Sequence, residues 1–130
     1  MQDILALAGR AGLAALFIWA GFGKLMDPTG TMQLIASMNV PLPIPVSVIY
    51  YVAVVIELGG GIALLLGIPA QSIAVILAAW SIATGIAVHL PMGDRVNMIN
   101  FYKNLSIAGG LLYVTAFGPG ALAIGAGRRI

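Results

Sequence analysis

The sequence predicts an all-α integral membrane protein, a four-helix bundle with a short interfacial lid segment between helices 1 and 2. Hydrophobic residues make up 61% of the chain, charged residues make up 8%, and the mean hydropathy is +1.06. A soluble domain carries about a quarter charged residues. Four apolar segments follow one another, each near the ~20 residues that a helix needs to cross a bilayer. We expect residues 1–130 to form a single transmembrane domain.

The first span is expected from Ile4 to Met26. Asp3 is placed to cap its N-terminus, and Asp27-Pro28 is a stop signal. The apolar run resembles the central region of a signal peptide. However, the preceding Met-Gln-Asp is not basic, and no convincing cleavage site follows. We therefore expect the segment to be retained as a span.

The connection from Asp27 to Pro45 is the longest in the chain. It contains a loosely helical apolar pattern, formed by Met32, Leu34, Ile35 and Met38. Three prolines then favour an extended approach to the second span, at positions 41, 43 and 45. This pattern predicts a short lid segment that lies at the membrane interface over one end of the bundle.

The remaining spans are separated by turn signals. The second is expected from Val46 to Leu66 and the third from Gln71 to Leu90. Only residues 67–70 separate these two, so the two helices should be antiparallel neighbours. The fourth is expected from Asn100 to Phe117, before the breaker cluster Gly118-Pro119-Gly120.

Glu57 lies near the middle of the second span. A carboxylate close to the bilayer midplane is costly, and by default it indicates a functional site with a partner. Helical spacing places small residues and Tyr50 on its face: Tyr50, Ala53, Gly60 and Gly61. A matching ladder on the third span is expected from Ala79, Ala83 and Ala87. Glu57 should therefore face the interior of the bundle, as a candidate catalytic proton acceptor.

The same spacing rule predicts partners for Glu57 on the other helices. One stripe of the first span runs through Arg10, Ala14, Phe17, Gly21 and Lys24. On the fourth span, one polar stripe contains Asn97, Asn100, Lys103 and Asn104. His89 lies at the end of the third span. We expect a ligand-binding cluster around Glu57. Its members would be Lys24, Lys103, Asn104, Asn100 and His89 toward the lid end, with Arg10 approaching from the other side. The alternative is a structural network, in which ion pairs set the helix register and Lys24 and Arg10 are interfacial anchors.

The composition argues against several classes of function. Six Lys and Arg residues are scattered singly against four acids, so no basic run is available for nucleic acid. One histidine and no cysteine leave no ligand set for haem, an iron–sulfur cluster or another metal site. An even number of spans puts both termini on one side with Arg10, Arg128 and Arg129, and leaves Lys24, Arg95 and Lys103 on the other. If Lys24 and Lys103 lie inside the bundle, they no longer count as loop charges, and the adjacent Arg128 and Arg129 favour the cytoplasm for the termini.

With these residues identified, the chain resembles the DoxX family of small bacterial four-helix inner-membrane proteins over nearly its whole length. Arg10 resembles an arginine of the family, and the segment Ala20 to Leu25 is similar to its AGxxKL signature. Further similar segments are Asn39 to Pro43, Glu57 to Gly61 with Gly67, His89, and Asn100 to Asn104. The end of the chain departs from the family pattern, because Ala123-Ile124-Gly125 replaces a small-x-Asp motif.

The resemblance implies a bacterial inner-membrane location and a link to quinone handling, because family members include a membrane subunit of a thiosulfate:quinone oxidoreductase. Our leading hypothesis is a redox-associated subunit that binds a quinone-like lipid head group near Glu57 and works with a redox partner protein. The alternative is a non-catalytic membrane scaffold or small-molecule carrier, whose polar cluster is structural. Proton-coupled transport is less favoured, because neither inverted repeats nor a broken helix are evident. The Gly and Ala ladders also permit a homo-oligomer.

Overall fold

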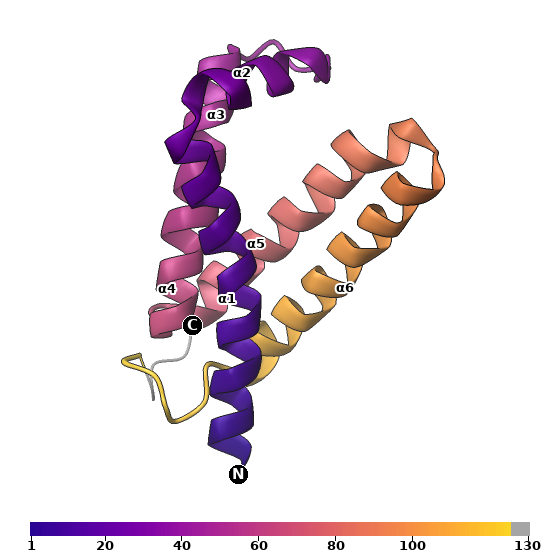
Figure 1. Ribbon diagram of the computed structural model, residues 1–130. Coiled ribbons are helices and arrows are strands. Elements are labelled where there is room, and N and C mark those ends of the chain that lie inside the picture. The colour runs from indigo at the N-terminus through magenta and orange to yellow at the C-terminus, as the bar shows by residue number, and fades with distance from the viewer. Residues whose placement is uncertain (126–130) are drawn as a thin grey trace.

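The computed structural model describes residues 1–125, and four long helical rods dominate this part of the chain (Figure 1). The first rod is α1 (Gln2–Met26). The second consists of α3 (Val46–Val54), the π-helical turn η1 (Val55–Gly59) and α4 (Gly60–Leu66). The third consists of α5 (Ala70–Thr84), the π-helical turn η2 (Gly85–His89) and the 3₁₀ turn η3 (Leu90–Met92), and the fourth is α6 (Arg95–Phe117). The predicted fold class, a four-helix membrane bundle, is confirmed.

Three of these rods are long and apolar enough to cross a membrane, namely Gln2–Met26, Val46–Leu66 and Ala70–Met92. The fourth rod, α6, is 23 residues long and packs along α5. It begins at Arg95, before the expected Asn100, because Asp94 caps it. The Asp94 carboxylate accepts hydrogen bonds from the backbone N–H and the side-chain amide of Asn97. Asp3, in contrast, is not the N-cap of α1, because the helix begins at Gln2 and places Asp3 within its first turn.

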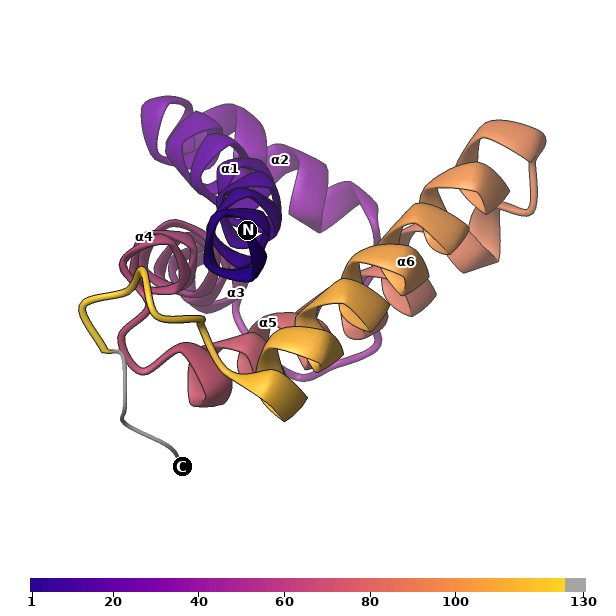
Figure 2. The same ribbon diagram turned by 90° about the horizontal axis from the view of Figure 1, so that it is seen from below.

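The rods form two antiparallel pairs. One pair is α1 with the second rod, and the other is the α5–α6 hairpin. The pairs meet at the terminal end of the bundle, where the chain begins and α6 ends, and they diverge toward the lid end (Figures 1 and 2). Among residues 1–125, α3 contacts neither α5 nor α6. The hydrophobic core lies at the junction of the pairs and consists of Ala14, Phe17, Leu64, Ala74, Leu77, Ala78, Ala108 and Leu111.

Close approach of helices occurs within the first pair. A Cβ on Gly21 would lie 2.5 Å from the backbone N of Leu58, and one on Gly61 would lie 2.9 Å from the backbone N of Ile18. Glycine at both positions therefore allows α1 and the second rod to pack closely.

The predicted alanine ladder on the third rod is wrong. Ala79, Ala83 and Ala87 are exposed, whereas the buried face of α5 contains Ala70, Ala74, Leu77, Ala78 and Ser81. The helix is apolar on all sides, so the sequence pattern does not distinguish its interior face from its lipid face. Large apolar side chains are correspondingly exposed around the rods, including Trp19 and Val55, which are 79% and 68% exposed. The lipid bilayer is the solvent for such a surface.

The segment predicted as a lid contains the helix α2 (Pro28–Ser37). The Asp27 side chain caps it by accepting a 3.0 Å hydrogen bond from the backbone N–H of Gly30. Ile35 is its buried residue. The helix lies across the end of α1 and α3 and, within residues 1–125, contacts neither α5 nor α6 (Figure 1). It therefore covers one of the two helix pairs.

Candidate functional site

Glu57 lies in the π-helical turn η1, midway along the second rod, and is 7% exposed. A π-helical turn within an α-helix is uncommon and frequently occurs at functional sites. The apolar run from Val46 to Leu66 predicts an unbroken α-helix here, so this turn is a feature that only the structure shows. The neighbouring residues of the predicted face, Tyr50, Ala53, Gly60 and Gly61, are also buried. The prediction that Glu57 points into the bundle is confirmed.

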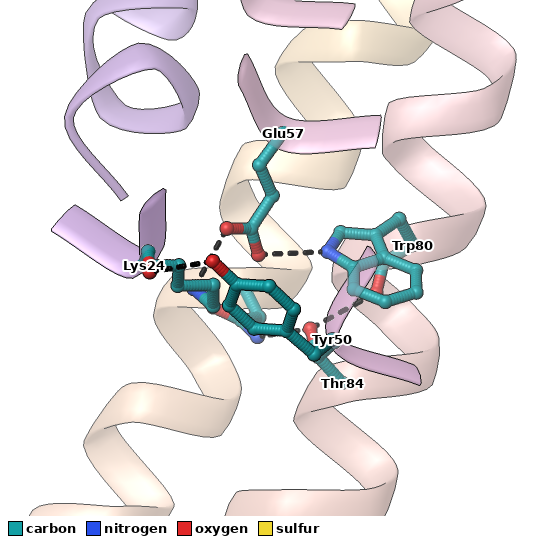
Figure 3. Close-up of polar contacts among 6 residues, drawn as sticks. Lys24, Tyr50, Glu57, Trp80 and Thr84 are labelled. Atoms are coloured by element: carbon teal, nitrogen blue, oxygen red, sulfur yellow. Dashed lines mark hydrogen bonds and ion pairs between the residues drawn. The ribbon is translucent and has the colours of Figure 1, made fainter. Parts of the chain in front are cut away.

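Both carboxylate oxygens of Glu57 accept a hydrogen bond (Figure 3). Lys24 Nζ of α1 donates to Oε2 at 2.7 Å and forms an ion pair with it. Trp80 Nε1 of α5 donates to Oε1 at 3.0 Å. The carboxylate thus joins three of the four rods. The side chain of Lys24 remains 29% exposed and that of Glu57 10% exposed, so the ion pair is partly accessible from outside the core.

A second layer of hydrogen bonds holds these partners in place. The Tyr50 hydroxyl donates to the backbone carbonyl of Lys24 at 3.1 Å (Figure 3). On α5, Thr84 Oγ1 donates to the carbonyl of Trp80 at 2.9 Å. Asn104 Nδ2 of α6 donates to the carbonyl of Ser81 at 3.1 Å and to Thr84 Oγ1 at 3.3 Å. All four rods therefore contribute to one polar network that is centred on Glu57.

Asn104 lies in the network as expected, but Lys103 does not. Lys103 is exposed, Asn100 is half-buried, and no hydrogen bond or ion pair within residues 1–125 joins either of them to Glu57. Successive residues of an α-helix are rotated by about 100°, so Lys103 and Asn104 cannot both face α5. Asn104 is the residue that faces α5, and it also lies against Gly85 in the second π-helical turn, η2.

His89 belongs to a separate group at the lid end. Its Nδ1 lies 3.0 Å from Oδ1 of Asn97, whose amide nitrogen donates to Asp94 Oδ1 at 2.7 Å. This hydrogen bond from the Asn97 side chain, together with the one from its backbone, lowers the pKa of Asp94. The expected contribution of His89 to the Glu57 cluster is therefore wrong, because the α5–α6 hairpin diverges from the second rod toward this end.

Arg10 also lies away from Glu57. It is 14 residues from Lys24 on the same face of α1, or about 21 Å along the helix axis. Its guanidinium donates to the backbone carbonyls of Pro119 and Leu122 beyond the end of α6, the latter at 2.8 Å. The expectation that Arg10 approaches Glu57 is wrong, because two residues on one helix face need not belong to one site.

Trp80 and Thr84 were not among the residues predicted for this site. An indole N–H inside an apolar span requires an acceptor, and Thr84 follows Trp80 at the spacing of one helical turn. These two features were available in the sequence. Tyr50 was assigned to the face of Glu57, but its hydrogen bond to the first rod depends on how the helices pack.

Comparison with known proteins supports the membrane assignment. The DoxX family model matches residues 5–90. "Inner membrane protein YqjF" of Escherichia coli (strain K12) is 35% identical over 127 residues, which cover 95% of this chain and 92% of that protein. "Inner membrane protein YphA" of the same organism is 37% identical over 128 residues, covering 95% of this chain and 89% of that protein. No solved structure matches the chain. Because the family model covers more than half of the chain and both relatives align over nearly its full length, this protein belongs to the DoxX family of membrane proteins.

Proposed function

We propose that this protein is a redox-associated subunit of the bacterial inner membrane that binds the head group of a quinone-like lipid beside Glu57. The supporting observation is the partly accessible ion pair between Lys24 and Glu57 in the middle of the apolar rods. It lies in the part of the second rod where the π-helical turn interrupts the α-helix and where contact with α5 ends. Intramembrane ion pairs are costly and mark ligand or proton pathways.

The hydrogen-bond donors at this site suit a quinone carbonyl. Lys24 donates one of its three N–H groups to Glu57, and within residues 1–125 the other two are available for a ligand. The single N–H of Trp80 is already donated to Glu57, so Trp80 orients the carboxylate. In this role Lys24 polarises the carbonyl, Glu57 accepts or returns a proton, and a redox partner protein supplies the electrons.

Quinone titration of the purified protein in detergent tests this proposal. A short-chain ubiquinone should bind saturably to the wild type, and Glu57→Gln should weaken binding about tenfold or more. Lys103→Gln is the matched control, because Lys103 is exposed and outside the network; its affinity should equal that of the wild type. Absence of saturable binding, or equal affinity of Glu57→Gln and wild type, would contradict the proposal.

A second candidate function is a membrane scaffold or small-molecule carrier in which the network is structural. It is favoured by the fact that both oxygens of Glu57 already have partners within the chain. For this role, Glu57→Gln should lower the unfolding temperature in detergent, and the wild type should bind no quinone. Association of copies into a homo-oligomer is compatible with either role, and sedimentation in detergent would measure it.

A further inference from the structure

The terminal end of the bundle has a second polar group, formed around Arg10. We define the C-terminal segment as residues 118–125, which follow α6. The backbone N–H of Ile124 donates to the carbonyl of Leu66 at 3.0 Å, and that of Ala121 donates to Oδ1 of Asp3 at 3.2 Å. Together with the two hydrogen bonds from Arg10, these contacts hold the C-terminal segment against the ends of α1 and α4.

A groove of about 460 Å³ lies between α1 and α6 at the same end. This volume is within the range of about 300–1,000 Å³ that is typical of ligand sites. Most of its wall is apolar and includes Leu5, Gly9, Leu13, Val114 and Phe117. Arg10 also lines it and is the one charged residue in its wall among residues 1–125. The groove therefore combines an apolar channel with a cation.

The charge of Arg10 is not neutralised within the described part of the chain. The side chain is 2% exposed, and its two hydrogen-bond acceptors are uncharged carbonyls. The buried Nε has no hydrogen-bond partner among residues 1–125. The one ion pair found within residues 1–125 joins Lys24 to Glu57, far from this end. Because a buried cation is strongly stabilised by an anion, this site favours an anionic ligand.

We propose that this groove binds an anionic diacyl phospholipid of the surrounding membrane leaflet. Its acyl chain would lie between α1 and α6, and its phosphate would face the guanidinium of Arg10. The expected depth of the Arg10 guanidinium in the membrane fits this arrangement. The guanidinium binds the carbonyls of Pro119 and Leu122, which lie beyond Phe117, the last residue of α6. The guanidinium is thus near the level of the head groups, where basic residues recognise anionic lipids.

Two pairs of glycines allow the groove to be blocked without changing Arg10. Gly9 lines the groove, whereas Gly12, on the same helix, does not, and a Cβ on either meets nothing within 4 Å. On α6, Gly110 lines the groove and a Cβ there is in ordinary contact with Leu13, whereas Gly109 is outside the groove and its Cβ would be in open space. A leucine at each position gains the same helix propensity. The Gly9 and Gly12 variants therefore differ in the groove alone, whereas the Gly110 and Gly109 variants differ in the groove and in contact with Leu13.

Native mass spectrometry of the purified protein in detergent tests the site. The probes are palmitoyl-oleoyl phosphatidylglycerol and the zwitterionic phosphatidylethanolamine with the same chains. The wild type, Gly12→Leu and Gly109→Leu should prefer phosphatidylglycerol about tenfold, and Gly9→Leu and Gly110→Leu should each weaken its binding about tenfold. Equal binding of the two lipids by the wild type would overturn the proposal. So would equal phosphatidylglycerol affinity of the blocking and control variants. Glu57 is unchanged in all of these proteins, so the result is independent of the quinone titration.

Discussion

The indole N–H of Trp80 lies 3.0 Å from Oε1 of Glu57 and links the α5–α6 hairpin to the second rod inside the apolar part of the protein. The other carboxylate oxygen is held by Lys24 from α1. Because α3 contacts neither α5 nor α6 among residues 1–125, this hydrogen bond is the polar link between the two helix pairs close to the place where they diverge. Its loss should therefore affect the packing of whole helices.

Trp80→Phe should lower the free energy of unfolding by about 1–3 kcal/mol, because it leaves Oε1 of Glu57 without its donor. Unfolding in detergent, followed by circular dichroism, measures this change. Trp19→Phe is the control, because Trp19 is 79% exposed, and it should change stability by less than about 0.5 kcal/mol. Equal effects of the two substitutions would show that the indole hydrogen bond does not stabilise the packing.

Lys24→Met should destabilise the protein by about 1–3 kcal/mol, because it leaves the Glu57 carboxyl group inside the apolar rods without the cation that pairs with it. The double variant Lys24→Met with Glu57→Gln should recover part of this loss, since neither charge is left alone. A double-mutant cycle of unfolding free energies measures the coupling, which we expect to be about 1–3 kcal/mol. Additive effects of the two substitutions would mean that the ion pair contributes nothing measurable.

Gly21→Ala should lower stability by about 1–3 kcal/mol, because its Cβ would lie 2.5 Å from the backbone N of Leu58 and the helices would have to separate. Gly23→Ala, two residues further along α1, is the matched control. Its Cβ meets nothing within 4 Å, so the substitution should be neutral or stabilising by about 0.5–1 kcal/mol through helix propensity. The measurement is the unfolding temperature of the two variants in detergent. A lower value for Gly21→Ala alone would show that close helix packing requires glycine at this position, whereas equal values would mean that helix propensity alone determines the effect.

The termini are predicted to face the cytoplasm. Arg10 lies at the terminal end, whereas Arg128 and Arg129 lie outside the described residues. The chain has no cysteine, so single-cysteine variants report one position each. In intact cells a membrane-impermeant maleimide should label Thr29→Cys on the lid segment and leave Gln2→Cys unlabelled until the cells are opened. Labelling of Gln2→Cys in intact cells would contradict this prediction and show that the termini face the outside of the membrane.

Several features of the fold could be predicted because they depend on composition and short-range spacing. The apolar runs predict rods whose length suits the bilayer, and the second of them occurs at Val46–Leu66 as expected. Helical periodicity also predicts that Arg10, Ala14, Phe17 and Gly21 share the buried face of α1. The position of Glu57 in mid-span likewise follows from the sequence alone.

The partners of Glu57 depend on how the rods pack, which periodicity does not encode. The spacing rule places Lys103 and Asn104 on one polar stripe, and the contact with α5 leaves Asn104 half-buried and hydrogen-bonded while Lys103 stays exposed. Helical spacing also does not predict the divergence of the helix pairs, which separates His89 from Glu57, or the position of the segment after α6, whose carbonyls bind Arg10 about 21 Å along α1 from Lys24. Inside a membrane nearly every helix face is apolar, so the sequence specifies which residues are costly to leave unpaired. The packing of four rods then determines that Lys24 and Trp80 are the residues that pair with Glu57.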